Sequence, residues 1–235
     1  MFSQENYPAD KVVNSFGVQD DFLYDYAIPV LNQRAATGQP FFATLLSISN
    51  HPPYVIPPFF HPKTSEPETQ IVEYADWALR QFFEEARKQP WFDNTIFVLE
   101  GDHGKLVGDA ECELPESYNH IPLMIYSSRI QPEEKTTFGG QVDIQPTILG
   151  LLNIDYLQNN FGVDLLKEER PCMFYTADNM VVGRNDTLLY LYNYETQQEL
   201  TYDIGNGKLN AVPMDDSFLP LKEYSFSMLQ SAEFL

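Results

Sequence analysis

The sequence predicts an α/β domain followed by a smaller antiparallel β subdomain. Two apolar runs, at residues 41–48 and 96–99, have the composition of strands that are buried in a parallel sheet. Residues 69–88 separate these runs and carry apolar side chains at helical spacing, which is the alternation typical of α/β proteins. From Cys172 onward the pattern changes to short alternating segments that are rich in Tyr and Thr, and these favour antiparallel strands.

The predicted elements follow one another in a simple order. Residues 20–34 form a helix in which Pro29 either weakens the pattern or marks a kink. The strand at 41–48 leads into a Pro-rich loop at 50–67, and loops of that length in compact domains are usually functional. The next elements are a helix at 69–88, strands at 96–99 and 121–126, and a short helix at 142–152.

The last part of the chain is expected to fold as a subdomain of its own. Its predicted strands lie near residues 173–176, 181–183, 187–192 and 199–202, and a final helix covers 215–235. The predicted boundaries are therefore an α/β portion at 1–170 and a β subdomain with a C-terminal helix at 171–235. A chain of 235 residues is long enough for this arrangement.

Composition and charge exclude several classes of protein. The formal net charge of −20, from 34 acidic and 14 basic residues, argues against a nucleic-acid partner. It also means that an anionic substrate would need a metal ion or a local basic group, although solubility is the commoner reason for such a charge. The sequence has no run of 18 apolar residues, so no membrane span is predicted, and the first ten residues lack the pattern of a signal peptide. Cys112 and Cys172 stand outside any CxxC pattern; a disulfide between them is possible, but two free thiols are expected.

The stretch TIFVLEGDHG carries the clearest chemical signal. Here an apolar strand is followed at once by Asp102 and His103, which stand between Gly101 and Gly104. Ligands of open α/β sheets bind at the carboxyl ends of strands, and a carboxylate beside an imidazole suits Mn²⁺ or Zn²⁺. The alternative is a surface turn with a capping Asp and a His of no function.

Other residues are candidates for the same site. His51 follows the predicted strand at 41–48 and could face the same crevice, although a loop histidine bonded to backbone is the commoner case. His120 precedes a strand, but the loop at 105–119 before it is long enough to cross the crevice. Asp143 is most simply a helix N-terminal cap, and His61 is expected on the surface.

Taken together, these motifs resemble one family. The segments FFATLLSISNHPPY, NTIFVLEGDHG, YNHIPLMIYS, QVDIQPTILGLLNI and FGVDLL occur in this order. They are similar to the sulfatase-type catalytic domain of the lipoteichoic acid synthase and phosphoglycerol transferase family, within the alkaline phosphatase superfamily. The resemblance extends over roughly residues 15–166, and more loosely over the tail.

The resemblance implies a fold, a cofactor and roles for residues. The expected fold is part of a three-layer αβα sandwich of the alkaline phosphatase type, with a smaller C-terminal antiparallel β subdomain. One divalent metal is expected, Mn²⁺ first, with Zn²⁺, Mg²⁺ or Ca²⁺ as alternatives. Asp102 and His103 match the metal ligands of the family, while His51 and His120 are the expected substrate-binding residues. The family also implies an extracytoplasmic location, on a parent protein that is associated with the membrane.

The nucleophile of the family is expected upstream of Met1, so no catalytic nucleophile is assigned in this chain. The expected function is transfer or hydrolysis of phosphoglycerol-type phosphodiesters, or of sulfate esters, on cell-envelope glycans or lipids, with this piece alone inactive. The alternative is an inactive sulfatase-like module that binds a glycan or a protein. An exposed apolar face is also expected, and with it self-association or pairing with the missing N-terminal segment.

Overall fold

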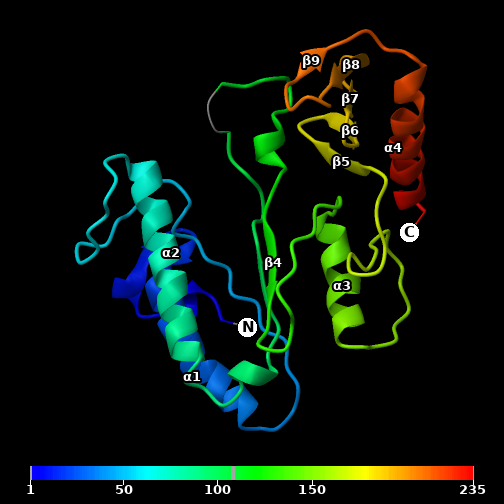
Figure 1. Ribbon diagram of the computed structural model, residues 1–235. Coiled ribbons are helices and arrows are strands. Elements are labelled where there is room, and N and C mark those ends of the chain that lie inside the picture. Colours follow the sequence, from blue (N-terminus) through cyan, green and yellow to red (C-terminus); the bar gives the residue numbers. More distant parts are fainter. Residues whose placement is uncertain (1, 107–108, 235) are drawn as a thin grey trace. The chain divides into compact units, whose positions relative to one another are not determined.

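A computed structural model describes residues 2–106 and 109–234, and its elements are labelled in Figure 1. The chain forms two compact units. The first contains the residues up to Val98 together with Met124–Gln131, and the second contains Leu99–Leu123 together with the residues from Pro132 onward. The boundary predicted at residues 170 and 171 stays a prediction.

The first unit is built on two helices that pack against each other. α1 spans Asp20–Ala35 and α2 spans Pro67–Ala86, which confirms both predicted helices to within two residues. Their apolar faces meet around Ala27, Leu31, Phe82 and Ala86, where Trp91 joins them from the segment that follows α2. The smaller elements are 3-10 helices at Gln4–Asn6, Ala9–Lys11 and Phe92–Asn94, and a hairpin of β1 (Val12–Asn14) and β2 (Gly17–Val18).

The predicted strand at 41–48 is wrong, because these residues have no regular secondary structure. Phe42 is 93% exposed and Leu46 is 72% exposed. A strand needs hydrogen-bonded neighbours, and no strand within the described part of the chain pairs with this segment. Its composition alone therefore cannot place it in a sheet.

β3 (Phe97–Glu100) and β4 (Leu123–Tyr126) are neighbours in a two-stranded sheet, which confirms both predicted strands. Their side chains alternate between half-buried and exposed positions, with Val98 36% exposed and Met124 55% exposed. The expectation that the strand before Asp102 is buried is therefore wrong. The finding that matters for the site is that β3 ends at Glu100, two residues before Asp102.

The second unit contains a five-stranded antiparallel sheet in the order β5-β6-β7-β8-β9. The strands are β5 Met173–Ala177, β6 Met180–Arg184, β7 Leu188–Asn193, β8 Gln198–Asp203 and β9 Asn210–Ala211. α4 (Leu219–Ala232) packs on β5 and β6, where a Cβ on Gly183 would lie 2.6 Å from the Ser225 hydroxyl (Figure 1). The four longer strands and the final helix confirm the prediction; Leu235, the end predicted for that helix, lies outside the described residues.

The remaining elements of the second unit are short, and all but the last 3-10 helix precede β5 in the chain. They are 3-10 helices at Glu116–Tyr118, Gln141–Asp143 and Asp216–Phe218, and the helix α3 at Ile144–Leu151. Both cysteines are free, as expected; Cys172 is buried, whereas Cys112 is half-buried. Among the described residues, none of the helices is both long and apolar enough to cross a bilayer.

Candidate metal-binding site

Asp102 and His103 form a tight turn directly after β3. The His103 backbone N–H donates to Asp102 Oδ1 over 3.0 Å, and Asp102 Oδ2 lies 3.8 Å from His103 Nε2. The side chains are 77% and 73% exposed, respectively, so solvent reaches both of them. The turn thus presents a carboxylate and an imidazole side by side.

The tautomer of His103 follows from one backbone contact. Its Nδ1 lies 2.7 Å from the carbonyl oxygen of Gly104, which can only accept a hydrogen bond. Nδ1 therefore carries the proton, and in the neutral ring the lone pair is on Nε2. A backbone carbonyl that orients an imidazole in this way is the usual outer contact of a metal-binding histidine.

The donor atoms fit a divalent ion. A carboxylate oxygen and an imidazole nitrogen each bind such ions at about 2.1 Å, so one ion can reach both atoms across the 3.8 Å gap. Carboxylate oxygen suits Mg²⁺, Ca²⁺ and Mn²⁺, and imidazole suits Zn²⁺. Within the described residues no cluster of three or more His, Cys, Asp or Glu side chains could hold a metal.

Gly104 fixes the turn against the segment that leads to His120. A Cβ on Gly104 would lie 1.9 Å from the Ser117 carbonyl oxygen, so no larger residue fits this backbone. The Gly104 N–H donates to the Tyr118 carbonyl over 2.8 Å, which brings residues 117–118 beside the turn. The imidazole of His120 is exposed, and within the described residues it forms no hydrogen bond to Asp102 or His103. Its substrate-binding role stays a prediction.

The loop at residues 105–119, which precedes His120, is anchored on the five-stranded sheet. Leu114 is 2% exposed and packs with the apolar side chains of the sheet. Glu113 accepts a hydrogen bond from the Tyr202 hydroxyl, and Glu116 pairs with Arg184 of β6. Burial, and then the hydrogen bond to Glu113, raise the pKa of Tyr202. Val107 and Gly108 of this loop lie outside the described residues.

His51 belongs to the first unit, so the prediction that it faces the same crevice as Asp102 stays a prediction. Its Nδ1 lies 2.7 Å from the Pro52 carbonyl, which again leaves the lone pair of the neutral ring on Nε2. The ring stacks near Phe16, with the centroids 4.1 Å apart and the planes tilted by 40°. His51 is exposed, as a substrate contact must be before the substrate arrives.

A buried carboxylate at the start of α1 positions His51. Asp20 is 2% exposed, and its Oδ1 accepts hydrogen bonds from the backbone N–H groups of Ile48 and Ser49, each over 3.0 Å. The Ser49 hydroxyl in turn accepts from the Asp20 N–H over 3.0 Å, and the His51 N–H donates to the Ile48 carbonyl over 3.1 Å. Sequence reasoning missed this anchor, because Asp20 at a helix start looks like an ordinary helix-terminal acid.

Asp143 is not the simple helix cap that the sequence predicts. Its side chain is fully buried and accepts from the backbone N–H groups of Gly140 and Val163, each over 2.8 Å, and from the Arg170 guanidinium. Burial acts to lower the pKa of Arg170, but the hydrogen bonds and charge of Asp143 outweigh it, so that this pKa lies above its ordinary value. The physical reason for the difference is the partner Arg170, which lies 27 residues further along the chain.

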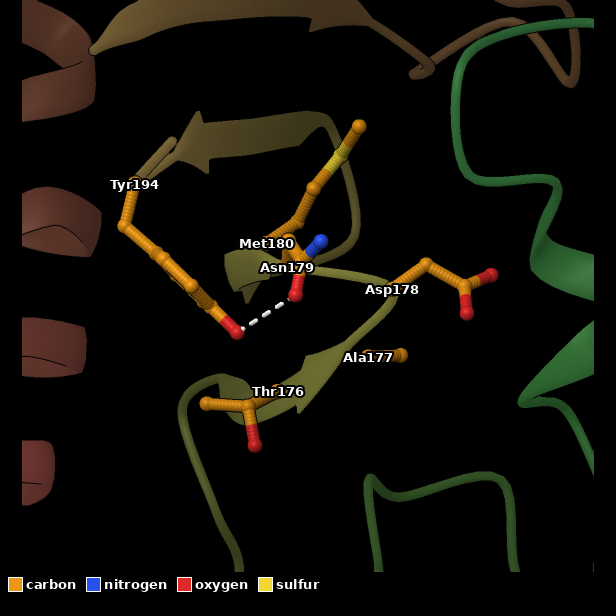
Figure 2. A pocket seen from close by; sticks show the side chains of 6 residues that line it. All are labelled: Thr176, Ala177, Asp178, Asn179, Met180 and Tyr194. Carbon is orange, nitrogen blue, oxygen red and sulfur yellow. Dashed lines mark hydrogen bonds between the residues drawn. The ribbon is translucent and has the colours of Figure 1, made fainter. Parts of the chain in front are cut away.

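A hollow of about 400 Å³ lies at the turn between β5 and β6, apart from all of the predicted site residues (Figure 2). Asp178 and Asn179 form this turn with φ of 47° and 63°, as a two-residue hairpin turn requires. The Tyr194 hydroxyl donates to Asn179 Oδ1 over 2.8 Å and so braces the rim. The hollow is open to solvent, and the residues that line it form or stabilise the hairpin turn.

The fold and the strand-end pair define a member of the alkaline phosphatase superfamily. A protein of that superfamily from Vibrio parahaemolyticus is 26% identical and superimposes with a TM-score of 0.82, over 98% of this chain and 58% of that one. The lipoteichoic acid synthase LtaP from Listeria monocytogenes, at 22% identity and a TM-score of 0.78 over 97% of this chain and 62% of that one, shares the fold. These similarities confirm the predicted α/β fold class.

More narrowly, the chain belongs to the sulfatase family, because the model of that family matches residues 2–154. Lipoteichoic acid synthase 1 of Bacillus subtilis is 27% identical over 221 residues, which cover 85% of this chain and 33% of the relative. Lipoteichoic acid synthase of Staphylococcus aureus is 25% identical over 191 residues, which cover 68% of this chain and 28% of the relative. The chain thus spans about a third of the length of the curated relatives that it matches.

Proposed function

We propose that this chain is part of a metal-dependent transferase or hydrolase that acts on phosphoglycerol-type phosphodiesters or on sulfate esters of cell-envelope glycans or lipids. The observation that carries the proposal is the pair of metal-competent groups after β3, the Asp102 carboxylate and Nε2 of His103, whose Oδ2 and Nε2 atoms lie 3.8 Å apart. Membership in the sulfatase family and similarity to lipoteichoic acid synthases support the reaction class.

Asp102 and His103 would hold one divalent ion, for which we propose Mn²⁺. A bound ion of this kind supplies Lewis-acid chemistry, since it offsets charge on phosphoryl or sulfuryl oxygens and lowers the pKa of a coordinated hydroxyl. The carboxylate contributes one negative charge, and the neutral imidazole contributes a nitrogen ligand without further charge. This economy matters in a chain with a net charge of −20, because every added anion repels an anionic substrate.

His51 and His120 would contact the substrate. With Nδ1 held by the Pro52 carbonyl, a protonated His51 directs its second N–H, at Nε2, away from its own loop. That N–H could donate to an ester oxygen and stabilise the negative charge that builds there in the transition state. No residue of this chain is assigned as the nucleophile. An extracytoplasmic location is part of the same proposal, because the reaction would act on polymers or lipids of the cell envelope.

We also propose that the apolar segment at 41–48 takes part in association, either with a second copy or with further chain that supplies the remaining metal ligands. The exposure of Phe42 and Leu46, at 93% and 72%, supports this, because apolar patches of such exposure are typical of interaction surfaces. Light scattering at increasing protein concentration tests the self-association. A monomer at all concentrations, with Phe42→Ser behaving in the same way, would argue for the second arrangement.

Mn²⁺ titration of this chain, followed by paramagnetic broadening of its NMR signals, tests the metal site. The histidine signals report directly, and broadening should centre on Asp102 and His103. It should weaken at least tenfold in Asp102→Asn, which keeps the shape but removes the charge, while His61→Gln serves as the exposed control. Broadening that is unchanged in Asp102→Asn and is centred on acidic surface patches would overturn the proposal and favour an inactive binding module.

A further inference from the structure

The side chain of Gln141 spans two consecutive carbonyl groups of the turn that carries the metal pair. Its Nε2 lies 3.1 Å from the Gly101 oxygen and 3.0 Å from the Asp102 oxygen. An amide NH₂ group has two hydrogens, so each carbonyl can receive one of them. The Gln141 amide therefore orients the peptide groups on both sides of the Asp102 α-carbon, and all of these residues lie in the second unit.

Gln141 is itself held in place by a buried ion pair. It opens the 3-10 helix Gln141–Asp143, where the Asp143 N–H donates to the Gly140 carbonyl over 2.9 Å. The Asp143 carboxylate accepts the Gly140 N–H over 2.8 Å and is clamped by Arg170. The side chains of Asp143 and Arg170 are 0% and 6% exposed, so this ion pair holds the 3-10 helix rigidly. Gln141 thus reaches the turn from a fixed point.

The turn depends on such hydrogen bonds because packing does not hold it. Asp102 and His103 are 77% and 73% exposed, and both side chains form hydrogen bonds to backbone groups of the same turn. What directs them is the backbone, which is fixed at Gly104 by the Tyr118 carbonyl and, two residues earlier, by Gln141. Groups that orient metal ligands from outside the coordination sphere typically contribute 10- to 100-fold to metal affinity.

We infer that Gln141 is a positioning residue for the metal site, which holds the carbonyls of Gly101 and Asp102 so that the Asp102 carboxylate and His103 Nε2 converge on one ion. This inference rests on the proposed function, since it assumes that Asp102 and His103 bind the metal. The segment Gln141–Asp143 would then have two roles: Asp143 stabilises its 3-10 helix, and Gln141 orients the backbone at Asp102.

The test uses the complete 235-residue chain and Mn²⁺ as the probe. Gln141→Met keeps the length of the side chain, adds no charge and removes the NH₂ donor. Gln145→Met makes the same change one turn further along, at an exposed glutamine whose hydrogen-bond partner is Asn160. Gln141→Met should weaken Mn²⁺ binding about tenfold, as measured by paramagnetic broadening, and Gln145→Met should leave it within twofold.

A second readout separates positioning from a general loss of structure. If Gln141 orients the pair, the ratio of Mn²⁺-induced broadening at the His103 ring to that at the Asp102 methylene protons changes in Gln141→Met. If the substitution only destabilises the fold, both signals decline together and the ratio stays constant. Equal affinity and an equal ratio in the two methionine variants would refute the role of Gln141 while the metal site stands. Binding that is insensitive to Asp102→Asn would instead overturn the proposed function, and this inference with it.

Discussion

Replacing Arg170 by Met should lower the free energy of unfolding by about 3–5 kcal/mol. Arg170 donates to the Asp143 carboxylate through Nε over 2.9 Å and also through Nη2, and the two side chains are 6% and 0% exposed. Methionine preserves much of the apolar stem but leaves the carboxylate buried without its counter-charge. The loss of that counter-charge, rather than the loss of packing, sets the magnitude.

The size of the effect follows from what stays behind. Two backbone donors, at Gly140 and Val163, still reach Asp143 over 2.8 Å, so the carboxylate keeps part of its solvation. The hydrogen bonds from two guanidinium nitrogens, Nε and Nη2, are lost, and a hydrogen bond to a charged group contributes about 1.5–3 kcal/mol. The Phe161 carbonyl also loses its donor. The sum agrees with the cost of breaking a buried ion pair from one side.

Urea denaturation followed by far-UV circular dichroism measures this loss, and hydrogen exchange locates it. Arg80→Met is the matched control, because Arg80 and Asp76 form the same kind of pair at 66% and 70% exposure, where about 0–1 kcal/mol is expected. Both tryptophans, Trp77 and Trp91, lie in the first unit, so their fluorescence reports on the unit that Arg170 does not belong to.

Adding Asp143→Asn to Arg170→Met supplies the decisive comparison. The double variant no longer buries an unpaired charge, so it should be more stable than Arg170→Met alone. Two results would refute the reasoning: a loss in Arg170→Met that is no larger than in Arg80→Met, or a double variant that is less stable than the single one. Either would mean that the buried carboxylate is not the source of the cost.

Three further predictions test other parts of the structure. Gly104→Ala should displace the turn at Asp102 and His103, because its Cβ would lie 1.9 Å from the Ser117 carbonyl oxygen, and should weaken Mn²⁺ binding at least tenfold in the same NMR titration. Gly101→Ala is the control and should be tolerated, because the atom nearest to its Cβ would lie 3.4 Å away. Burial, and then nearby acidic charge, raise the pKa of Tyr175 from 10.0 to about 12, so its contribution to stability is complete below pH 10 and is lost as pH rises towards 12. Tyr175→Phe should flatten that alkaline loss in urea denaturation at each pH. Arg184→Met should free the loop at 105–119, seen as faster hydrogen exchange there with little change in the exchange of α4.

The sequence predicts well those elements whose signal is local. α2 has apolar residues at helical spacing over its whole length, and the structure places the helix within two residues of its predicted bounds. The strands that flank the DHG and NHIP motifs are short, yet the turn residues beside them mark their ends. The hairpin of β1 and β2 was missed because strands of three and two residues carry too little pattern.

Other errors arise where a residue's role depends on a partner that is distant in the sequence. The run at 41–48 has the composition of a buried strand, but a strand exists only when another strand pairs with it. Asp143 resembles a helix cap until Arg170 is placed beside it, and Asp20 resembles a helix-terminal acid until it binds the backbone of Ser49. In each case the local pattern describes the side chains correctly but not their structural role, because that role depends on a distant partner.

The candidate site likewise has one part that a local pattern predicts and one part that depends on distant residues. The chemical types of the proposed ligands can be predicted from the three residues Asp102, His103 and Gly104, because a carboxylate and an imidazole at a strand end suit a divalent ion. Their direction cannot, since it depends on Gly104 meeting Tyr118 and on Gln141 reaching back over 39 and 40 residues to the same turn. The proposed metal site is therefore specified twice, once by the two proposed ligands and once by the distant hydrogen-bond partners that hold their backbone. Asp102→Asn therefore tests whether this turn is a metal site, and Gln141→Met tests whether a side chain 39 residues away holds the backbone of that site.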